Sequence, residues 1–192
     1  MQKITDEVFT VDGFLAPEEC DDFIRQSEST GYSNAPITTS RGPVLRPQIR
    51  NNSRVMVDDN SLADRLWRLV SSEALVALRS EVQMPFPNKS RWEPAGLNER
   101  FRFYRYTQGQ QFDWHYDGPY ERPNGEASWV TLLVYLNDDF EGGETRFEDC
   151  VVKPEKGMAL FFVHQIHHKG EKIASGRKYV LRTDVMYELK KN

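Results

Sequence analysis

The sequence has few cysteines, no long apolar run and no concentrated basic segment. Its two cysteines, Cys20 and Cys150, lie far apart without CxxC spacing, which argues against a disulfide framework or a zinc ribbon. No stretch approaches the roughly 18 apolar residues of a membrane-spanning helix. The opening stretch MQKITDEVFTVDGFL lacks the apolar segment of a secretion signal. We therefore expect a soluble, cytoplasmic protein with no membrane partner.

The charge balance is mildly acidic, with a net charge of -4. A protein that binds mainly to phosphate backbones needs a clustered basic surface, so we expect no nucleic-acid partner. A chain of 192 residues, 39% of them hydrophobic, suits one globular domain with a sizeable core. We predict one domain over 1–192, in which 1–96 form helical support and a long loop and 97–192 form most of the core.

Two segments in the first half have helical patterns. In LAPEECDDFIRQSEST, Pro17 stands at the start, acidic residues occupy the first turn and Gly31 follows the end. The segment 58–78, DDNSLADRLWRLVSSEALVAL, has leucines three or four residues apart behind an Asp/Asn cap, which predicts the strongest helix. Between them, Ser33–Asn52 is rich in Pro, Thr, Arg and Asn and predicts a long loop or irregular hairpin, a kind of segment that is often functional.

The pattern changes from Leu97 onward. Short β-branched or aromatic runs alternate with turn signals such as RPNGE, NDDFEGGE and PEKG. The runs are RFRFYRYT, SWVTLLVYLN, TRFEDCVVKP, MALFFVH and RKYVLRTDVMYEL. Five or more short strands at this spacing predict an antiparallel sandwich or barrel that follows two supporting helices.

The four histidines of the chain are concentrated in two places. His115 stands two residues before Asp117 in QFDWHYDG, and residues two apart on an extended segment point to the same face. FFVHQIHHKG contains His164, His167 and His168. Two histidines and one carboxylate are the ligand set of non-haem Fe(II), which leaves positions open for other ligands. Taken alone, the three clustered histidines can equally be surface residues of a turn.

Four motifs in order, over Leu97–Tyr187, resemble one known family, the 2-oxoglutarate/Fe(II)-dependent dioxygenases of the prolyl 4-hydroxylase-like branch. RYTQGQQFDWHYDG resembles the segment of this branch that carries the His-x-Asp pair, and VTLLVYLNDDFEGGETRF resembles its Tyr-Leu-Asn strand and Gly-Gly-Glu-Thr turn. PEKGMALFF resembles the next strand entry, and HKGEKIASGRKYVLRTDV has the later histidine followed by two glycines and a lysine at the family's spacing. The resemblance implies a mainly β, α+β fold, with a double-stranded β-helix (a jelly-roll, cupin-like core) backed by N-terminal helices.

The resemblance implies three iron ligands, His115, Asp117 and His168. His168 is chosen over its neighbours because it alone precedes the glycines and the lysine at the matching spacing. His167 is interpreted as a packing residue beside the site, and His164 as the end of a strand. The same three residues are the expected catalytic centre.

The resemblance also implies 2-oxoglutarate and O2 as co-substrates and ascorbate as a reductant. Lys178 matches the basic residue that holds the 5-carboxylate, and Tyr135 matches a hydroxyl that assists it. Thr131 shares the strand face of Tyr135, and Tyr106 is expected at the pocket rim, where ordinary aromatic packing is the alternative. Arg182 shares the strand face of Lys178 and is a further candidate, although the spacing from the histidine favours Lys178.

For function, the resemblance implies hydroxylation of an unactivated C–H bond in a protein residue, an amino acid or a small metabolite, with release of succinate and CO2. Asp117 favours hydroxylation, because related halogenases have a small residue at that position. The alternative is a sensor that binds metal and 2-oxoglutarate without turnover. Arg50, Asn52 and Arg102 are candidate substrate contacts at the expected mouth, and solvated or structural charges are the competing interpretation.

Overall fold

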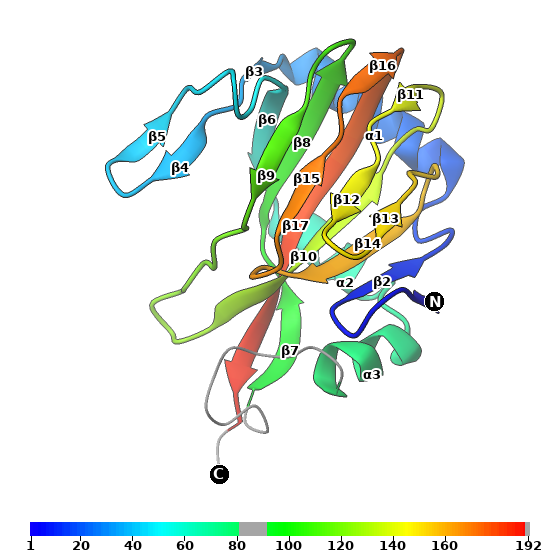
Figure 1. Cartoon of the computed structure of the whole chain (residues 1–192). Helices are drawn as coiled ribbons and strands as arrows, with labels where there is room; N and C mark the ends of the chain where they lie inside the picture. Colours follow the sequence, from blue (N-terminus) through cyan, green and yellow to red (C-terminus); the bar gives the residue numbers. More distant parts are fainter. Residues whose placement is uncertain (81–91, 191–192) are drawn as a thin grey trace.

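The computed structural model describes residues 1–80 and 92–190, and two antiparallel sheets dominate this part of the chain (Figure 1). The larger sheet has the order β1-β2-β14-β10-β17-β8-β6-β3, with β7 also paired to β17. Its strands are β1 (Gln2–Lys3), β2 (Val8–Val11), β3 (Ser33–Asn34), β6 (Ser53–Asp58), β7 (Trp92–Leu97), β8 (Arg100–Thr107), β10 (Ala127–Tyr135), β14 (Ala159–Val163) and β17 (Arg177–Leu189).

A smaller sheet with the order β13-β12-β15-β9 carries the histidine motifs. Two separate strand pairs, β4-β5 and β11-β16, complete the described strands. The bounds of these elements are β4 (Ile37–Thr39), β5 (Gly42–Val44), β9 (Phe112–His115), β11 (Glu141–Gly142), β12 (Thr145–Phe147), β13 (Val151–Val152), β15 (His168–Gly170) and β16 (Ile173–Ser175).

Three helices occur in the described residues, α1 (Pro17–Thr30), α2 (Asn60–Trp67) and α3 (Ser72–Ser80). Helix α1 begins and ends where the sequence predicts, with Pro17 in the first turn and Gly31 at the C-cap. None of the three is long and apolar enough to cross a membrane.

The prediction of one helix over 58–78 is wrong, because the chain turns between α2 and α3. Asp59 caps α2 by accepting a hydrogen bond from Leu62 N at 2.9 Å, as the Asp/Asn signal indicates. A second cap follows inside the pattern, since Ser71 Oγ accepts from Ala74 N at 3.2 Å. A serine at this position starts a new helix more readily than it continues an old one.

The first half also contains strands that the helical interpretation missed. Strand β2 pairs with β14, and β6 pairs with β8 from Ser53↔Arg105 to Asp58↔Arg100, so both extend the larger sheet. The predicted irregular hairpin within 33–52 is present, since β4 pairs with β5. Residues 1–96 therefore contribute strands as well as helices, because pairing with distant strands does not require a strong local pattern.

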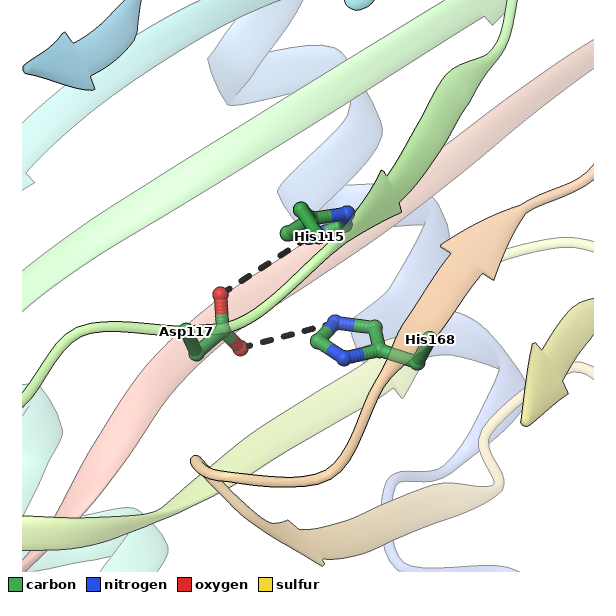
Figure 2. Close-up of side chains that lie close together, drawn as sticks. All are labelled: His115, Asp117 and His168. Atoms are coloured by element: carbon green, nitrogen blue, oxygen red, sulfur yellow. Dashed lines mark ion pairs between the residues drawn. The ribbon is translucent and has the colours of Figure 1, made fainter. Parts of the chain in front are cut away.

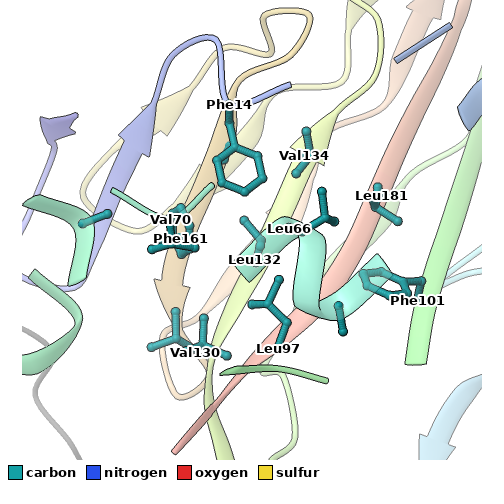
Figure 3. Packing of buried hydrophobic residues seen from close by; sticks show 14 of the residues in the cluster. Phe14, Leu66, Val70, Leu97, Phe101, Val130, Leu132, Val134, Phe161 and Leu181 are labelled. Carbon is teal, nitrogen blue, oxygen red and sulfur yellow. The ribbon is translucent and has the colours of Figure 1, made fainter. Parts of the chain in front are cut away.

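Strand alternation divides the buried residues into two cores. On β10, Val130, Leu132 and Val134 face the helices and pack with residues such as Phe161 and Leu66 (Figure 3). The alternate residues face the smaller sheet and form a second core, which contains Tyr104, Tyr106, Tyr135, Phe147, Leu160, Phe162 and Val180. Helices on one face and a second sheet on the other produce the double-stranded β-helix that the sequence predicts.

Candidate metal centre

The His-x-Asp pair and the later histidine meet between the two sheets. His115 ends β9, His168 begins β15, and the two residues are directly opposite each other in the antiparallel pairing. Asp117 follows β9 in the chain, and its side chain points between the two imidazoles (Figure 2). One ligand atom from each of the three residues lies within 4.8 Å of the others. The predicted triad is thus brought together by strand pairing.

Both imidazoles are oriented by the backbone. His115 Nδ1 lies 2.7 Å from the carbonyl oxygen of Asp113, and His168 Nδ1 lies 3.0 Å from that of Ile166. A carbonyl oxygen can only accept, so each Nδ1 carries the proton and each Nε2 keeps a free lone pair. The two Nε2 atoms face the Asp117 carboxylate at 3.9 and 3.7 Å. These are the tautomers that a metal requires of its histidine ligands.

The carboxylate of Asp117 is held at both oxygens. Thr131 Oγ1 donates to Oδ2 at 2.6 Å, and Arg182 Nη1 lies 2.9 Å from Oδ1. The Asp117 amide also donates to the carbonyl oxygen of His164 at 3.1 Å. Supporting contacts of this kind fix the direction in which a ligating carboxylate points.

Burial and neighbouring charges set the protonation of the triad. Burial and the neighbouring His168 lower the pKa of His115 to about 3, and burial also lowers the pKa of His168. Burial alone would raise the pKa of Asp117, but the guanidinium group of Arg182 outweighs it and holds the pKa well below its usual range. Two neutral imidazoles and one carboxylate therefore face the same point. This donor set fits Fe(II) and leaves coordination positions open.

A pocket extends from the triad toward the N-terminal end of β17, where Lys178 lies. The pocket is lined by the triad and by Tyr104, Tyr106, Phe112, Leu133, Thr145, Phe162, Gly170, Lys178, Val180 and Arg182. Lys178 Nζ donates to the carbonyl oxygen of Gly143 at 2.5 Å and lies 5.1 Å from the ring centre of Tyr135. Burial lowers the pKa of Lys178 to about 7. No carboxylate of the described residues forms an ion pair with this ammonium group.

The Gly-Gly-Glu-Thr turn explains how a backbone carbonyl reaches Lys178. Gly143 has φ +72°, and a Cβ atom there would lie 2.4 Å from Ile173 Cδ1 and 3.3 Å from Lys178 Cδ. A larger residue at 143 would thus be strained and would displace the lysine. The next residues of the turn bring Thr145 to the pocket wall, where its hydroxyl is 2.7 Å from the Tyr135 hydroxyl.

The other predicted cofactor residues occupy distinct places. Tyr106 lines the pocket, with its ring centre 5.7 Å from Lys178 Nζ. Tyr135 contacts the pocket through Thr145, which the sequence analysis did not single out although the Gly-Gly-Glu-Thr motif ends on it. Thr131 and Arg182 both hold Asp117, so the structure places them beside the metal ligand rather than beside Lys178.

The candidate substrate residues lie around a groove that His115 and Asp117 also line. Arg50 and Arg102 line this groove. Asn52 is fully buried behind Arg50 and accepts a hydrogen bond from Arg50 Nε at 2.8 Å. Arg102 pairs with Asp184 at 3.2 Å. Asn52 therefore supports Arg50, while Arg102 belongs to a buried ion network.

The two remaining histidines lie outside the triad. His164 directly follows β14, as predicted for a strand end, and its Nε2 is 3.5 Å from Asp184. His167 stacks on Tyr116, with ring centres 4.8 Å apart, and also contacts the ring of Trp114. Neither histidine belongs to the group of ligand atoms that converge in the described residues.

A double-stranded β-helix with two histidines and a carboxylate at its centre defines the class of non-haem iron oxygenases. A family model described as "2OG-Fe(II) oxygenase superfamily" matches residues 101–183. This part of the chain is thus similar to the superfamily, and the chain is similar to prolyl 4-hydroxylases, which confirms the resemblance drawn from the motifs. This match, together with the converging triad, supports the predicted Fe(II), 2-oxoglutarate and O2.

Curated relatives include two proteins of Arabidopsis thaliana. The chain is 27% identical to "Probable prolyl 4-hydroxylase 7" over 82% of its own length and 52% of the relative's. It is 25% identical to "Prolyl 4-hydroxylase 1" over 81% of its length and 56% of the relative's. The chain thus spans about half the length of these relatives.

Two solved structures have the same fold. A viral collagen prolyl hydroxylase from Paramecium Bursaria Chlorella virus-1, in a 2-oxoglutarate complex, aligns with a TM-score of 0.62 and 22% identity, covering 94% of this chain and 96% of that one. A Trichoplax adhaerens prolyl hydroxylase, in complex with a hypoxia inducible factor peptide, aligns with a TM-score of 0.66 and 18% identity, covering 94% and 84%. They confirm the predicted double-stranded β-helix.

Proposed function

We propose that this protein is an Fe(II)- and 2-oxoglutarate-dependent dioxygenase that hydroxylates a C–H bond of a peptide residue, with proline the first residue to test. The observation that carries the proposal is the pocket that joins the His115–Asp117–His168 triad to the buried, unpaired Lys178. A metal site beside a buried cation suits a co-substrate that has a chelating end and a distant carboxylate. 2-Oxoglutarate is such a molecule.

In this proposal, His115 Nε2, His168 Nε2 and one oxygen of Asp117 hold the iron. Bound Fe(II) and 2-oxoglutarate supply the oxidising chemistry, in which O2 is consumed and succinate and CO2 are released. The chain itself orients the reactants and keeps water away. Phe162, Leu133 and Val180 give the pocket an apolar wall.

Lys178 is assigned to the 5-carboxylate of 2-oxoglutarate, with Thr145 and Tyr106 beside it. A buried carboxylate is costly unless a cation and hydrogen-bond donors meet it. Lys178 has the complementary difficulty, since burial lowers its pKa to about 7 even though the charge of Glu144 acts in the opposite direction, and no carboxylate of the described residues forms an ion pair with it. Binding of 2-oxoglutarate would remove both penalties at once.

The peptide substrate is supported by the groove at the mouth and by the relatives. The groove measures about 580 Å³ and runs along His115 and Asp117, the β4–β5 hairpin side and the segment after Asp117. The relatives named above are prolyl hydroxylases, and the Trichoplax structure holds a peptide. A free amino acid or another small metabolite is the competing substrate. The cytoplasmic location and the use of ascorbate stay predictions from the sequence.

The test is succinate formation from 2-oxoglutarate with Fe(II), with and without proline-containing peptides, together with a search for products heavier by one oxygen atom. His115→Ala should lose bound metal and turnover while the fold persists. His167→Ala is the matched control, because this half-buried histidine stacks on Tyr116 outside the triad and should keep both. Metal at wild-type stoichiometry in His115→Ala would contradict the ligand assignment.

A non-catalytic sensor is not favoured, because the complete triad and Lys178 provide what turnover needs. The sensor makes a distinct prediction. It would bind one metal ion and 2-oxoglutarate per chain, yet form no succinate with any peptide or free amino acid. A chlorinated product at physiological chloride would contradict hydroxylation, since Asp117 occupies the position that a halide would need.

A further inference from the structure

The groove at the mouth of the site has an uneven distribution of charge. Its lining includes Arg50, Arg54, Arg102, Arg182, Asp117 and Asp184. Four of these residues are arginines and two are aspartates. The wall is otherwise mainly aromatic and aliphatic. A ligand in this groove therefore meets more cations than anions.

The two aspartates are already engaged inside the protein. Asp117 pairs with Arg182 at 2.9 Å, and Asp184 pairs with Arg182 at 3.2 Å and with Arg102 at 3.2 Å. Two carboxylates thus balance two guanidinium groups. Within 1–80 and 92–190, no carboxylate forms an ion pair with either of the other two arginines, Arg50 and Arg54.

Arg50 is held rigidly in this unbalanced state. Its side chain is only 6% exposed, and its guanidinium carbon lies 4.3 Å from the ring centre of Phe112 and 4.5 Å from that of Tyr104. Its Nε donates to Asn52, whereas its Nη2 is buried and has no hydrogen-bond partner. Cation–π contacts recover part of the lost hydration, but a buried guanidinium nitrogen without an acceptor remains costly.

The nearby titratable groups respond to this positive charge. Burial alone would raise the pKa of Tyr104, yet Arg50, Arg182 and Arg102 outweigh it and lower the pKa to about 8. The pKa of Arg54 is lowered by partial burial and by Arg50 and Arg102, although Tyr104 acts in the opposite direction. Both shifts point to a positive potential at this end of the groove.

We propose that the groove recognises a carboxylate of the substrate through Arg50, with Arg54 beside it, so that the preferred substrate is acidic close to the hydroxylated carbon. This inference rests on the proposed function and adds a substrate class to it. The 2-oxoglutarate pocket adjoins this groove at His115 and Asp117, but its basic residue is Lys178, and Arg50 lines only the groove.

The stacking order limits how far this carboxylate lies from the reacting carbon. Phe112 stacks on His115 with ring centres 3.5 Å apart, and Arg50 covers the same phenylalanine. One aromatic ring therefore separates the guanidinium from a proposed iron ligand. Because neighbouring Cα atoms are about 3.8 Å apart, the acidic group belongs to the target residue or to one of its near neighbours.

The same carboxylate chemistry can come from an aspartate or glutamate side chain in a peptide or from the α-carboxylate of a free amino acid. The probes distinguish the two sources. The peptide arm uses acetyl-Ala-Xaa-Pro-Yaa-Ala-amide, with glutamate or glutamine at Xaa or Yaa. The free arm uses L-proline and L-prolinamide. Affinity is measured by calorimetry on protein loaded with Mn(II) and 2-oxoglutarate, and on protein without either.

For the wild-type protein, at least one acid should bind about tenfold more tightly than its amide partner, which corresponds to about 1.4 kcal/mol. Arg50→Gln should remove this preference and leave the affinity for 2-oxoglutarate unchanged. Arg50→Lys keeps the charge and should keep part of the preference. Arg41→Gln is the matched control, since Arg41 is exposed on the β4–β5 turn and does not line the groove.

Equal affinity for acid and amide in every pair, or no binding by any probe, overturns the carboxylate site, as does a preference that persists in Arg50→Gln. If circular dichroism shows that Arg50→Gln is unfolded, Arg54→Gln serves instead and should reduce the preference. The proposed function is judged separately by succinate formation. An acid preference without succinate would retain this inference and reject the dioxygenase, and succinate without an acid preference would do the reverse.

Discussion

Two buried cations on the same face of β17 differ in their partners. Arg182 pairs with two aspartates, Asp117 and Asp184, whereas Lys178, four residues earlier, donates a hydrogen bond to the carbonyl oxygen of Gly143 and pairs with no described carboxylate. Both line the same pocket. The charge of Arg182 is balanced within the protein, so this residue supports the metal ligand. Lys178 forms no ion pair with a carboxylate of the described residues, and only the charge of Glu144 opposes the effect of its burial. This is the condition expected of a residue that binds an anionic ligand.

Removing Arg182 should have the largest effect on folding. Arg182→Met leaves two buried aspartates without their shared partner, and breaking a buried ion pair in this way costs about 3–5 kcal/mol. We expect the free energy of unfolding in urea to fall by that order and metal affinity to fall with it. An unfolding curve that coincides with the wild-type curve would show that the network is not the main support of Asp117.

Removing Lys178 should act on the ligand instead. Lys178→Met removes an unbalanced cation, so the ligand-free protein should be as stable as the wild type or more stable. The affinity for 2-oxoglutarate should fall by about 2–5 kcal/mol, much of it from leaving the carboxylate unpaired. That is roughly 30-fold or more. Calorimetry with Mn(II) present measures it, and unchanged metal binding is the internal control.

If Lys178→Met is nearly silent and Arg182→Met alone weakens 2-oxoglutarate binding, the assignment of the two residues must be exchanged. Arg177→Met is a useful further control. This arginine faces the other side of β17, is exposed and donates a hydrogen bond to the Tyr179 hydroxyl. The Arg177→Met variant should therefore bind 2-oxoglutarate as the wild type does.

Thr131 offers a smaller test of how Asp117 is held. Thr131→Val keeps the shape of the side chain and removes the hydrogen bond to Asp117 Oδ2. Outer contacts of this type typically change metal affinity by about 10- to 100-fold. We expect a loss near the lower value, because Arg182 still holds the other oxygen. Competition with a fluorescent chelator measures it, and a change in 2-oxoglutarate affinity without a change in metal affinity would point to a direct contact with the co-substrate.

The sequence predicted those strands whose burial is visible as an alternation of neighbouring residues. The runs RFRFYRYT and RKYVLRTDVMYEL coincide with β8 and β17, because alternation on a two-sided strand is visible in the sequence. The same alternation placed Lys178 and Arg182 on one strand face, and both line the pocket. The family spacing singled out His168, and the structure pairs it with His115.

Long-range contacts could not be predicted in this way. Nothing near Arg50 in the sequence indicates that it covers Phe112, and nothing near Thr131 indicates that it reaches Asp117. The break between α2 and α3 was missed because Ser71 acts as a cap only when the chain turns there. Strand β6 was missed since its pairing with β8 matters more than its own weak pattern.

The smallest expected effect is a pH dependence that belongs to Lys178 alone. Burial lowers its pKa to about 7, whereas an unfolded lysine titrates near 10.4. Between these values the unfolded chain binds more protons than the folded one, so stability rises with pH. For a folded pKa of about 7, the gain in stability from pH 7 to pH 8 is about 1 kcal/mol, and it is lost again as the pH falls back to 7.

Urea unfolding at both pH values, compared with Lys178→Met, isolates this contribution from other titrating groups. Saturating 2-oxoglutarate should abolish the difference, because its carboxylate favours the charged lysine. If the unfolding free energies of the ligand-free wild type and Lys178→Met change with pH in parallel, Lys178 stays charged when buried. Its lack of a carboxylate partner would then have no effect on stability that distinguishes it from Arg182.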